Sequence, residues 1–576
     1  MRHRITISLL TLGLLAGSLA VATAPKNTLV WHITEDPSTL DPHQAYDTVA
    51  LLPLDNIYET LVTFKGNGKD ANAFAPMLAT AWTTSSDGLK YMFSLRQGVK
   101  FHSGNPMTCD DAAYSFRRLL VTNNGESPAW FVSLPLLGFD YFDDKSKAKL
   151  SFADLEKAVS CDAGGKLVFN LKSRDPAFLA KLRVSSNAIV DGKYAVAGGE
   201  WSGTKSDLKA WIGKNLNDSY LSKNPSGTGA YKLLKRDPDQ LIFRAFDSYW
   251  AGKPKLENVI LKKVENEAGR ILAVQKGDAD VIALDARASL KQLVGAAGVR
   301  VVDNVPSVST VRIITMNQKI TPSDLLGSGK LDGQGIPANF FSDIHVRKGF
   351  ALAFDHSRYI KEVLSGEGQN RTMGLPDTYL GYDKTLKPLG FNLERAKTEF
   401  KAAWGGQVWK NGFTLKASHS AGVQIYQSGL ELLKATLEQI NPKFKLVVQS
   451  RQTGAETEDG GAGKVPMSFT SWLADYPDSD NMLRSIYATK GGYYSRWLNH
   501  GDTKIDTLLE QAYATGDSSK RATVYAQIGK RMNDQVTAIL VPAELGFRVL
   551  RSDLKGFAEN INPLLSSDVR WKDLSK

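Results

Sequence analysis

The chain has 576 residues, of which 42% are hydrophobic and 23% are charged, a composition that is typical of globular proteins and argues against a disordered or membrane-embedded chain. Its formal net charge is +11, but the basic residues are scattered and form no run interleaved with aromatic residues, which argues against a nucleic-acid partner. No run of about 18 apolar residues follows the N-terminal segment, and this excludes a later transmembrane helix.

The N-terminal segment has the pattern of an export signal. Residues 1–4 are basic, residues 5–20 are apolar, and small residues follow. We predict a signal peptide over residues 1–22, cleaved after Ala22, because cleavage after Ala24 would leave Pro25 first; an uncleaved anchor helix is the alternative. Removal takes two arginines and no acid, so 71 basic residues become 69 against 60 acidic ones, a net charge of +9. No cysteine follows the apolar run, so we expect no lipid anchor and a periplasmic location.

Hydrophobic periodicity predicts an alternation of strands and helices in an α/β chain long enough for more than one core. In chain order, strands are expected over residues 28–33, 89–96, 166–171, 227–234, 241–245, 259–264, 280–283, 309–316, 443–449, 465–470, 539–542 and 546–550. Helices are expected over residues 51–64, 110–120, 176–182, 267–276, 345–364, 393–404, 424–440, 504–513 and 520–536. Thr108 and Asp111 have the capping-box spacing, and Gly277 stands where a helix C-cap would.

The chain contains two cysteines, Cys109 and Cys161. An even number in an exported chain favours one disulfide. The closed loop of about 50 residues would contribute on the order of 4 kcal/mol in the chain-entropy description. Two buried free thiols are the alternative.

Motifs for catalysis or cofactor binding are absent from the sequence. None of the eight histidines lies three or four residues from another, so no local metal site is predicted. There is no Gly-x-Ser-x-Gly nucleophile motif. Residues 326–331 lack the spacing of a phosphate loop. Residues 333–338 mimic a dinucleotide turn, but they contain Pro337 and follow no predicted strand. We therefore predict no cofactor and no metal, and a binding protein instead of an enzyme.

One segment, residues 471–480, combines a tryptophan with several carboxylates just after a predicted strand. Trp472 and Asp475 are expected in a loop, which Pro477 keeps from continuing as regular structure. Two interpretations follow from the residues alone. The segment is a solvated acidic turn, or Asp475 is an anion in a cleft that receives a cation, with Trp472 as an apolar wall.

The order of several short motifs resembles the family 5 extracellular solute-binding proteins, the oligopeptide-, dipeptide- and nickel-binding proteins of ABC importers. The resemblance covers about residues 27–560. Its motifs here are Ser38–His43, Tyr58–Leu61, Leu78–Trp82, Phe93–Gly104, Gly227–Tyr231, Tyr249–Trp250, Gln275–Asp280 and Asp343–Asp355.

This resemblance implies a two-lobed α/β periplasmic-binding-protein fold of the type II, hinge-closing kind, with an additional inserted α/β domain. Lobe I would comprise residues 27–62, 224–305 and 546–576, the inserted domain residues 63–223, and lobe II residues 306–545. The hinge crossings would lie near Val311 and Phe547. Both cysteines would then brace the inserted domain.

The resemblance also implies a ligand site around Trp472–Asp475. Asp475 would take the α-ammonium of a peptide, and the backbone around Ser471 and Leu473 would pair with the peptide main chain as an added strand. Leu473 departs from the small or polar residue common there, which would narrow or dry the pocket. Asp478 and Asp480 are expected to be solvated. Four further positions are implied: Tyr46 and Thr48 as the opposing strand, Trp130 (or Phe131) in the cleft, and Arg371 as a carboxylate-binding residue or else a surface arginine.

The predicted function is that of a monomeric periplasmic carrier, which captures peptides and delivers them to a membrane permease without a catalytic step. The first alternative is a protein of the same fold that binds a sugar, an opine, nickel or another metal chelate, or haem, because the fold does not fix the ligand. A secreted hydrolase is the second alternative, although neither a nucleophile nor a pair of acids is visible.

Overall fold

The computed structural model describes residues 26–65, 73–124, 126–139, 149–305, 310–562 and 569–576. The predicted signal peptide, residues 1–22, lies outside these ranges. Among the described residues the strands form sheets of seven, five and four strands, here called sheets I, II and III, and two pairs of short strands. No helix within these ranges combines the length and the apolar character needed to cross a membrane. The predicted α/β class is confirmed.

Sheet I is assembled from segments that are far apart in the sequence. In sheet order its strands are β12 (Val299–Val305), β20 (Gly546–Arg551), β11 (Val281–Ile282), β1 (Thr28–Ile33), β10 (Asn258–Lys263), β9 (Gln240–Ala245) and β8 (Tyr231–Asp237). β1 is parallel to β10 and β11, and α10 (Glu267–Lys276) forms the crossover between them, as parallel strands require. Gly277 ends α10 in the left-handed conformation, as predicted. The hydrophobic cluster around this sheet also includes side chains of α1 (Thr48–Ile57), α9 (Tyr220–Lys223) and α21 (Phe557–Asn560).

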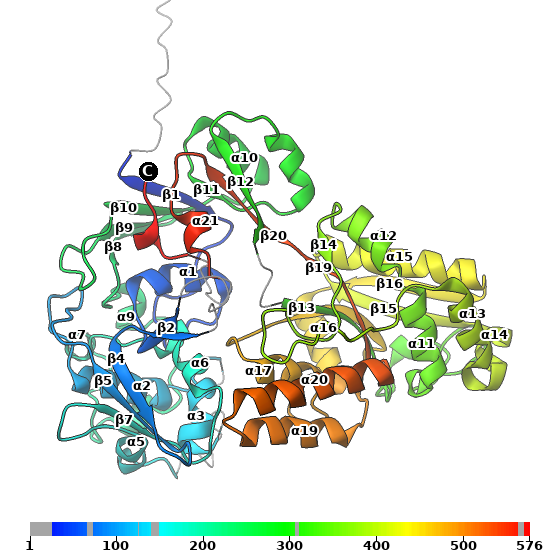
Figure 1. Cartoon of the computed structure of the whole chain (residues 1–576), viewed down its shortest axis with the longest axis horizontal. Coiled ribbons are helices and arrows are strands. Elements are labelled where there is room, and N and C mark those ends of the chain that lie inside the picture. Colours follow the sequence, from blue (N-terminus) through cyan, green and yellow to red (C-terminus); the bar gives the residue numbers. More distant parts are fainter. Residues whose placement is uncertain (1–25, 66–72, 125, 140–148, 306–309, 563–568) are drawn as a thin grey trace, which may run out of the picture.

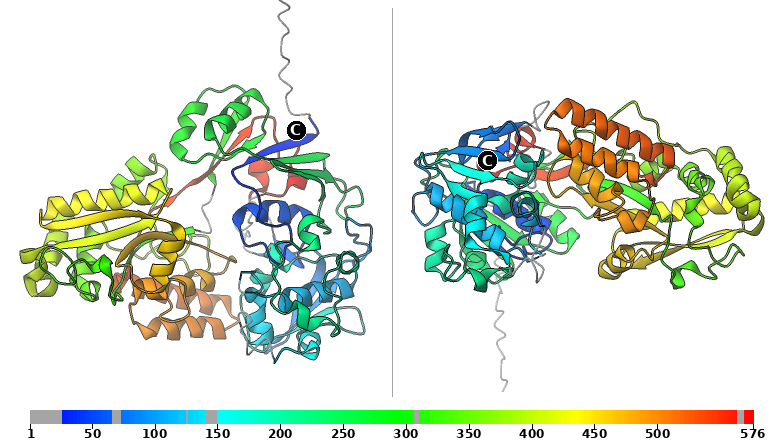
Figure 2. Two further views of the ribbon diagram at one scale, coloured as in Figure 1. Left: turned by 180° about the vertical axis from the view of Figure 1, so that it is seen from behind. Right: turned by 90° about the horizontal axis from the view of Figure 1, so that it is seen from below.

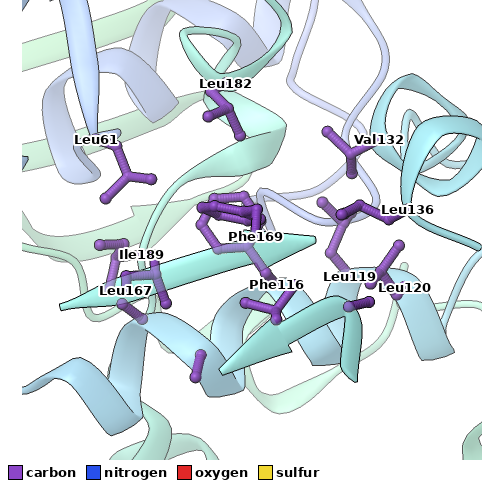
Figure 3. Close-up of a cluster of buried hydrophobic side chains, with 14 of the residues drawn as sticks. Leu61, Phe116, Leu119, Leu120, Val132, Leu136, Leu167, Phe169, Leu182 and Ile189 are labelled. Carbon is purple, nitrogen blue, oxygen red and sulfur yellow. The ribbon is translucent and has the colours of Figure 1, made fainter. Parts of the chain in front are cut away.

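Sheet III and its helices form a second core. The sheet order is β4 (Ala79–Thr84), β5 (Lys90–Leu95), β7 (Leu167–Asn170) and β6 (Val159–Cys161). The helices are α2 (Cys109–Val121), α3 (Trp130–Leu137), α5 (Phe152–Ala158), α6 (Phe178–Leu182), α7 (Gly192–Ala197) and α8 (Leu208–Trp211). Figure 3 shows the buried side chains between them, with Phe169 of β7 at the centre and Phe116 and Leu119 of α2 beside it. α2 begins with the predicted capping box of Thr108 and Asp111.

Cys109 and Cys161 form a disulfide that ties the first residue of α2 to the last residue of β6. Because the bond is internal to this unit, it restrains the unfolded chain around sheet III and leaves other parts of the protein free. We expect no free thiol when the protein is denatured without reductant, and two after reduction. Two titratable thiols before reduction would contradict the disulfide.

Sheet II forms the third unit. Its strand order is β16 (Phe444–Arg451), β15 (Phe413–Ser420), β17 (Met467–Leu473), β13 (Thr310–Met316) and β18 (Ala538–Leu540). Its helices are α11 (Ile344–Ala353), α12 (His356–Arg358), α13 (Leu393–Ala402), α14 (Gln407–Asn411), α15 (Gln424–Ile440), α16 (Thr453–Gly461), α17 (Ser479–Tyr487), α18 (Ser495–Leu498), α19 (Thr503–Ala514) and α20 (Ser518–Gln535). The predicted bounds of α15 agree with the structure.

Two predicted helices are wrong in their extent. The helix expected over residues 51–64 ends at Ile57, and Val62–Phe64 forms β2, paired with β3 (Phe74–Pro76). The apolar residues of this segment fit the spacing of a helix as well as that of a strand, so periodicity alone does not decide between them. The helix expected over residues 345–364 breaks at Phe354, where Asp355 caps α12 through its side chain. A short polar side chain competing for backbone N–H groups explains this break.

The chain passes between sheets I and II twice. The first passage, from β12 to β13, runs through residues 306–309, which lie outside the described ranges. The second joins β19 (Ala543–Glu544), which pairs with β14 (Gly368–Gln369), to β20. A cavity of about 290 Å³ lies at this second passage, and its lining includes Arg287, Glu544 and Phe547. Figure 1 shows sheets I and II in opposite halves of the molecule, with β20 leading from one half to the other. The passages are adjacent to the predicted hinge positions, Val311 and Phe547.

The two halves also meet away from these passages. The left view of Figure 2 places α19 and α20 next to the helices of the sheet III unit. Here Tyr476, which follows β17, is 5% exposed and belongs to the hydrophobic cluster of the sheet III unit. Its ring packs edge-on against Phe131 at 5.5 Å, and the Lys181 ammonium lies 5.0 Å from its centroid.

Candidate functional site

The site is built on the C-terminal end of β17. This strand continues to Leu473, so Ser471 and Trp472 lie in a strand and not in the predicted loop. β13 pairs with the whole of β17, with Val311 opposite Trp472 and Thr310 opposite Leu473. On the other edge β15 pairs only with Met467–Phe469. Within the described part of the chain, no strand covers that edge at residues 471–473.

The backbone groups of Ser471 and Leu473 point toward this uncovered edge. The Asn317 N–H donates to the Pro466 carbonyl at 3.0 Å, which identifies the hydrogen-bonded pairs of the antiparallel β13–β17 ladder. Because such pairs alternate, Trp472 turns its backbone groups to Val311, and its two neighbours turn theirs away from β13. The Ser471 carbonyl accepts a hydrogen bond from Tyr494 Oη at 2.7 Å on that outer side. This bond uses one of the two lone pairs of the carbonyl, so the second lone pair and the outward groups of Leu473 can pair with another extended chain.

Asp475 lies two residues beyond β17 and is half-buried. Its Oδ1 accepts a hydrogen bond from Tyr46 Oη at 2.5 Å, across 429 residues of sequence. Its Oδ2 accepts one from Asn481 Nδ2 at 2.8 Å. A carboxylate has about four acceptor positions, so these two bonds leave room for a further donor. A half-buried carboxylate with spare acceptor positions can bind a cation.

Burial raises the pKa of the Asp475 carboxyl above its ordinary value, and the hydrogen bonds from Tyr46 and Asn481 oppose this shift. Asp475 interacts electrostatically with the hydroxyls of Tyr46, Tyr379 and Tyr476. Burial is the main reason why the pKa of each of these hydroxyls is raised. These phenols stay protonated across the physiological range. Asp475 is therefore the group of this set that changes charge in acid.

Trp472 and Leu473 lie on opposite faces of β17, because successive side chains of a strand alternate. The half-buried Trp472 packs against Tyr493, with ring centroids 5.0 Å apart, and its Nε1 donates to Asn481 Oδ1 at 3.1 Å. Leu473 is 44% exposed. Ser471 shares the face of Leu473, and its Oγ accepts a hydrogen bond from Tyr426 Oη.

The structure brings some of the other predicted residues to Asp475. Tyr46 contacts it directly, and the Trp130 side chain lies close enough to the Tyr46 hydroxyl to oppose part of the rise in its pKa. Phe131 packs edge-on against Tyr46 at 6.0 Å, so both alternatives at this position lie beside the site. Thr48 is the first residue of α1, so the expected opposing strand over Tyr46 and Thr48 is wrong: the described chain forms a bend and then a helix.

Arg371 is not a surface arginine. It is 8% exposed, and its guanidinium donates to the carbonyls of Leu375 and Thr310, each at 3.3 Å. Thr310 is the partner of Leu473 in the ladder, so Arg371 lies on the β13 side of the end of β17. Burial lowers the Arg371 pKa. The buried Tyr379 ring interacts electrostatically with both Asp475 and Arg371, which places the two charged groups in one neighbourhood.

Two acidic residues predicted to be solvated are structural. Asp478 caps α17 and pairs with Arg521 at 2.6 Å, and Asp480, 2% exposed, pairs with Arg484 at 3.0 Å. The helix itself was missed. Its signal was present in the sequence as a capping aspartate before apolar residues at a helical spacing, Met482, Leu483, Ile486 and Tyr487. Asn481 and Tyr476 are the site residues that sequence reasoning overlooked.

Among the residues that the structure describes, no three histidine, cysteine or carboxylate side chains lie together as metal ligands would. The cavity at the second passage is lined by other residues than those predicted for the site. The strand end with Asp475 therefore remains the best candidate.

Comparison with known proteins adds a family match over most of the chain. Residues 73–494 match the family described as bacterial extracellular solute-binding proteins, family 5 (middle region). The dipeptide-binding protein of Escherichia coli K12 is 24% identical over 96% of each chain. Heme-binding protein A of Haemophilus influenzae is 26% identical over 88% of this chain and 84% of its own.

Among solved structures, a dipeptide-binding protein from Pseudoalteromonas sp. SM9913, in complex with Met-Leu, superimposes with a TM-score of 0.69. It is 20% identical and covers 95% of this chain and all of its own. At this identity the likeness shows the fold alone: the architecture is that of the two-lobed periplasmic binding proteins.

Proposed function

The chain belongs to the bacterial extracellular solute-binding proteins of family 5, and from this premise we propose that it captures short peptides and delivers them to the permease of an ABC transporter. The observation that carries the proposal is the pairing of Asp475 with the uncovered end of β17. A peptide has a cationic N-terminus and main-chain hydrogen-bonding groups whatever its sequence. A carboxylate beside an uncovered strand edge matches both features.

We further propose that the ligand lies between two lobes that close by hinge motion, with lobe I at residues 27–62, 224–305 and 546–576, the inserted domain at 63–223, and lobe II at 306–545. The support is topological: sheets I, III and II draw their strands from these three sets of residues. In this arrangement Asp475 and Tyr476 belong to lobe II, whereas Tyr46 belongs to lobe I and Phe131 to the inserted domain. Closure of lobe II then forms the contacts around Asp475.

Replacing Tyr476 with alanine is expected to favour separation of the lobes. The substitution removes a ring buried against Phe131 and Lys181, a contact worth about 1.5–3 kcal/mol for a fully buried aromatic side chain. Small-angle scattering of the peptide-free protein should show a larger radius of gyration. Tyr476→Phe retains the ring and serves as the matched control. Identical scattering of Tyr476→Ala and wild-type protein would contradict the role of Tyr476 in closure.

Peptide affinity is expected to fall in acid at a higher pH than an ordinary aspartate would give. An ammonium ligand binds the ionised carboxyl, so affinity is full above the pKa of Asp475 in the free protein and falls about tenfold per pH unit below it. Because burial raises this pKa, the loss begins early. Calorimetric titration across the acid range measures it. An affinity unchanged until the protein unfolds would argue against an ionised Asp475 as the anchor.

Ligand identity is tested most directly by native mass spectrometry of the purified protein, followed by titration with a panel of dipeptides and tripeptides. Retained peptides, or micromolar binding of panel members, would support the proposal. Retention of haem would instead support the alternative that the Haemophilus relative suggests. Retention of a metal chelate would support another non-peptide ligand.

The proposal also covers location, oligomeric state and chemistry. The protein is exported by the N-terminal signal and acts as a soluble monomer in the periplasm. It carries its ligand without chemical change, so a bound peptide should be recovered intact after prolonged incubation. Metals and cofactors have no part in this function.

A further inference from the structure

The side-chain amide of Asn481 joins the polar groups of the segment around Asp475. Its Oδ1 accepts hydrogen bonds from Trp472 Nε1 and from the Asp475 N–H, both at 3.1 Å, while its Nδ2 donates to Asp475 Oδ2 at 2.8 Å. An amide oxygen has two lone pairs, so these bonds use its accepting capacity. One side chain thus fixes an indole, a backbone position and a carboxylate relative to one another.

Asn481 is itself held rigidly. It is the third residue of α17 and is 3% exposed. Ion pairs of Asp478 with Arg521 and of Asp480 with Arg484 fix the first turn of this helix. The amide therefore has little freedom to follow the carboxylate if Asp475 turns, and the carboxylate adjusts to the amide.

The two oxygens of Asp475 have different neighbours. Oδ2 is bound to Asn481 within the sheet II unit, whereas Oδ1 receives Tyr46, which precedes α1 in the other half of the molecule. A free carboxylate can rotate and exchange its oxygens. The bond to Asn481 removes that rotation and leaves Oδ1 facing the opposite half.

On the basis of the proposed function, we propose that Asn481 is the positioning residue of the ammonium site, which orients the Asp475 carboxylate so that the protein prefers ligands with a free amino group. Asn481 does not touch the ligand in this account. It acts through Asp475: it holds the carboxylate in one orientation, in which the hydrogen bond to the ligand's ammonium is stronger than one that a mobile carboxylate would make.

The test compares two probes, Met-Leu and N-acetyl-Met-Leu, in three proteins. The ratio of their dissociation constants measures the preference for a free amine, and competition titration gives the weaker value. Asn481→Ala should lower the wild-type ratio at least about tenfold, the scale of one hydrogen bond to a charged group. Most of the change should fall on Met-Leu.

Asn317→Ala is the matched control. Asn317 is also fully buried, and its Nδ2 donates to the carbonyls of Gly463 and Val465 at the far end of the same β13–β17 ladder. Loss of the Asn317 amide should lower the stability of the protein but leave the ratio of the two dissociation constants unchanged. Asn481→Ser retains a hydroxyl that can accept one of the two bonds, and it replaces Asn481→Ala if that variant does not fold.

The possible outcomes distinguish the role of Asn481 from the ammonium site at Asp475. An unchanged ratio in the Asn481 variants, with both probes weakened equally or not at all, would show a purely structural asparagine and overturn the inference. A ratio near one in the wild type itself would instead overturn the ammonium site of the proposed function. A large wild-type ratio that falls only in the Asn481 variants is the expected result.

Discussion

Asp475→Ala is expected to weaken the binding of a free-amine peptide by about 2–5 kcal/mol, the cost of truncating one partner of a buried charge pair. The ammonium of the peptide would be left in a half-buried site that holds no compensating charge. The same carboxylate also accepts the Tyr46 and Asn481 hydrogen bonds, so part of the loss would come from disorder of its neighbours. Calorimetric titration of the wild type and the variant with one peptide measures the effect.

Two further variants separate charge from general damage. Asp475→Asn preserves the size of the side chain and removes its charge, so it should lose most of the same affinity. Asp459→Ala removes a partly buried carboxylate that pairs with Arg451 and Lys464 elsewhere in the sheet II unit, and it should bind peptide as the wild type does. Wild-type affinity of Asp475→Asn would exclude an ammonium–carboxylate pair.

Arg118→Met is expected to destabilise the protein by about 3–5 kcal/mol, because it would leave two buried carboxylates without their cation. Arg118 Nη2 lies 2.6 Å from Asp41 Oδ2 and 2.9 Å from Glu200 Oε2, and these three side chains are at most 1% exposed. The guanidinium also donates to His43 Nδ1 at 2.9 Å. Burial, with Arg118 next to it, lowers the pKa of His43 to about 3, so this imidazole is neutral and can accept the bond.

The buried cluster around Arg118 connects two parts of the protein, so its loss should affect the stability of both. Asp41 and His43 belong to the chain between β1 and α1, whereas Arg118 lies in α2 of the sheet III unit. The cluster therefore joins sheet I to sheet III, and its loss should lower the urea midpoint of both units together. Arg358→Ala, which breaks an exposed pair with Glu362, is the control and should cost less than about 0.5 kcal/mol. A midpoint for Arg118→Met equal to that of the control would contradict the structural role.

Short-range patterns predicted much of the fold. Capping and periodicity placed α2, α10 and α15 well, because these helices carry both a start or stop signal and a clear apolar face. They failed for residues 227–230, expected in a strand. There a Cβ on Gly227 would lie 2.1 Å from the Ile57 carbonyl, so the glycines allow a close approach to α1 that only the tertiary structure reveals.

The candidate site was predictable only in part. The resemblance pointed to Trp472 and Asp475, but the strand predicted over residues 465–470 ended before Trp472, and the helix that follows was not predicted. Tyr46 and Asp475 are 429 residues apart, and no local pattern relates two such positions. Tyr476 acts through contacts with the distant sheet III core, which no local pattern reveals. Asn481 contacts Trp472 and Asp475, nine and six residues away, but only the turn between β17 and α17 brings these side chains together.

In the proposed function, a carboxylate at the end of an uncovered strand recognises the free N-terminus of a peptide. The most direct measurement is a calorimetric titration of the wild-type protein with Met-Leu and with N-acetyl-Met-Leu. We expect the acetylated peptide to bind at least about thirtyfold more weakly, the lower end of the range for losing a buried charge partner. Equally tight binding of both peptides would contradict the claim.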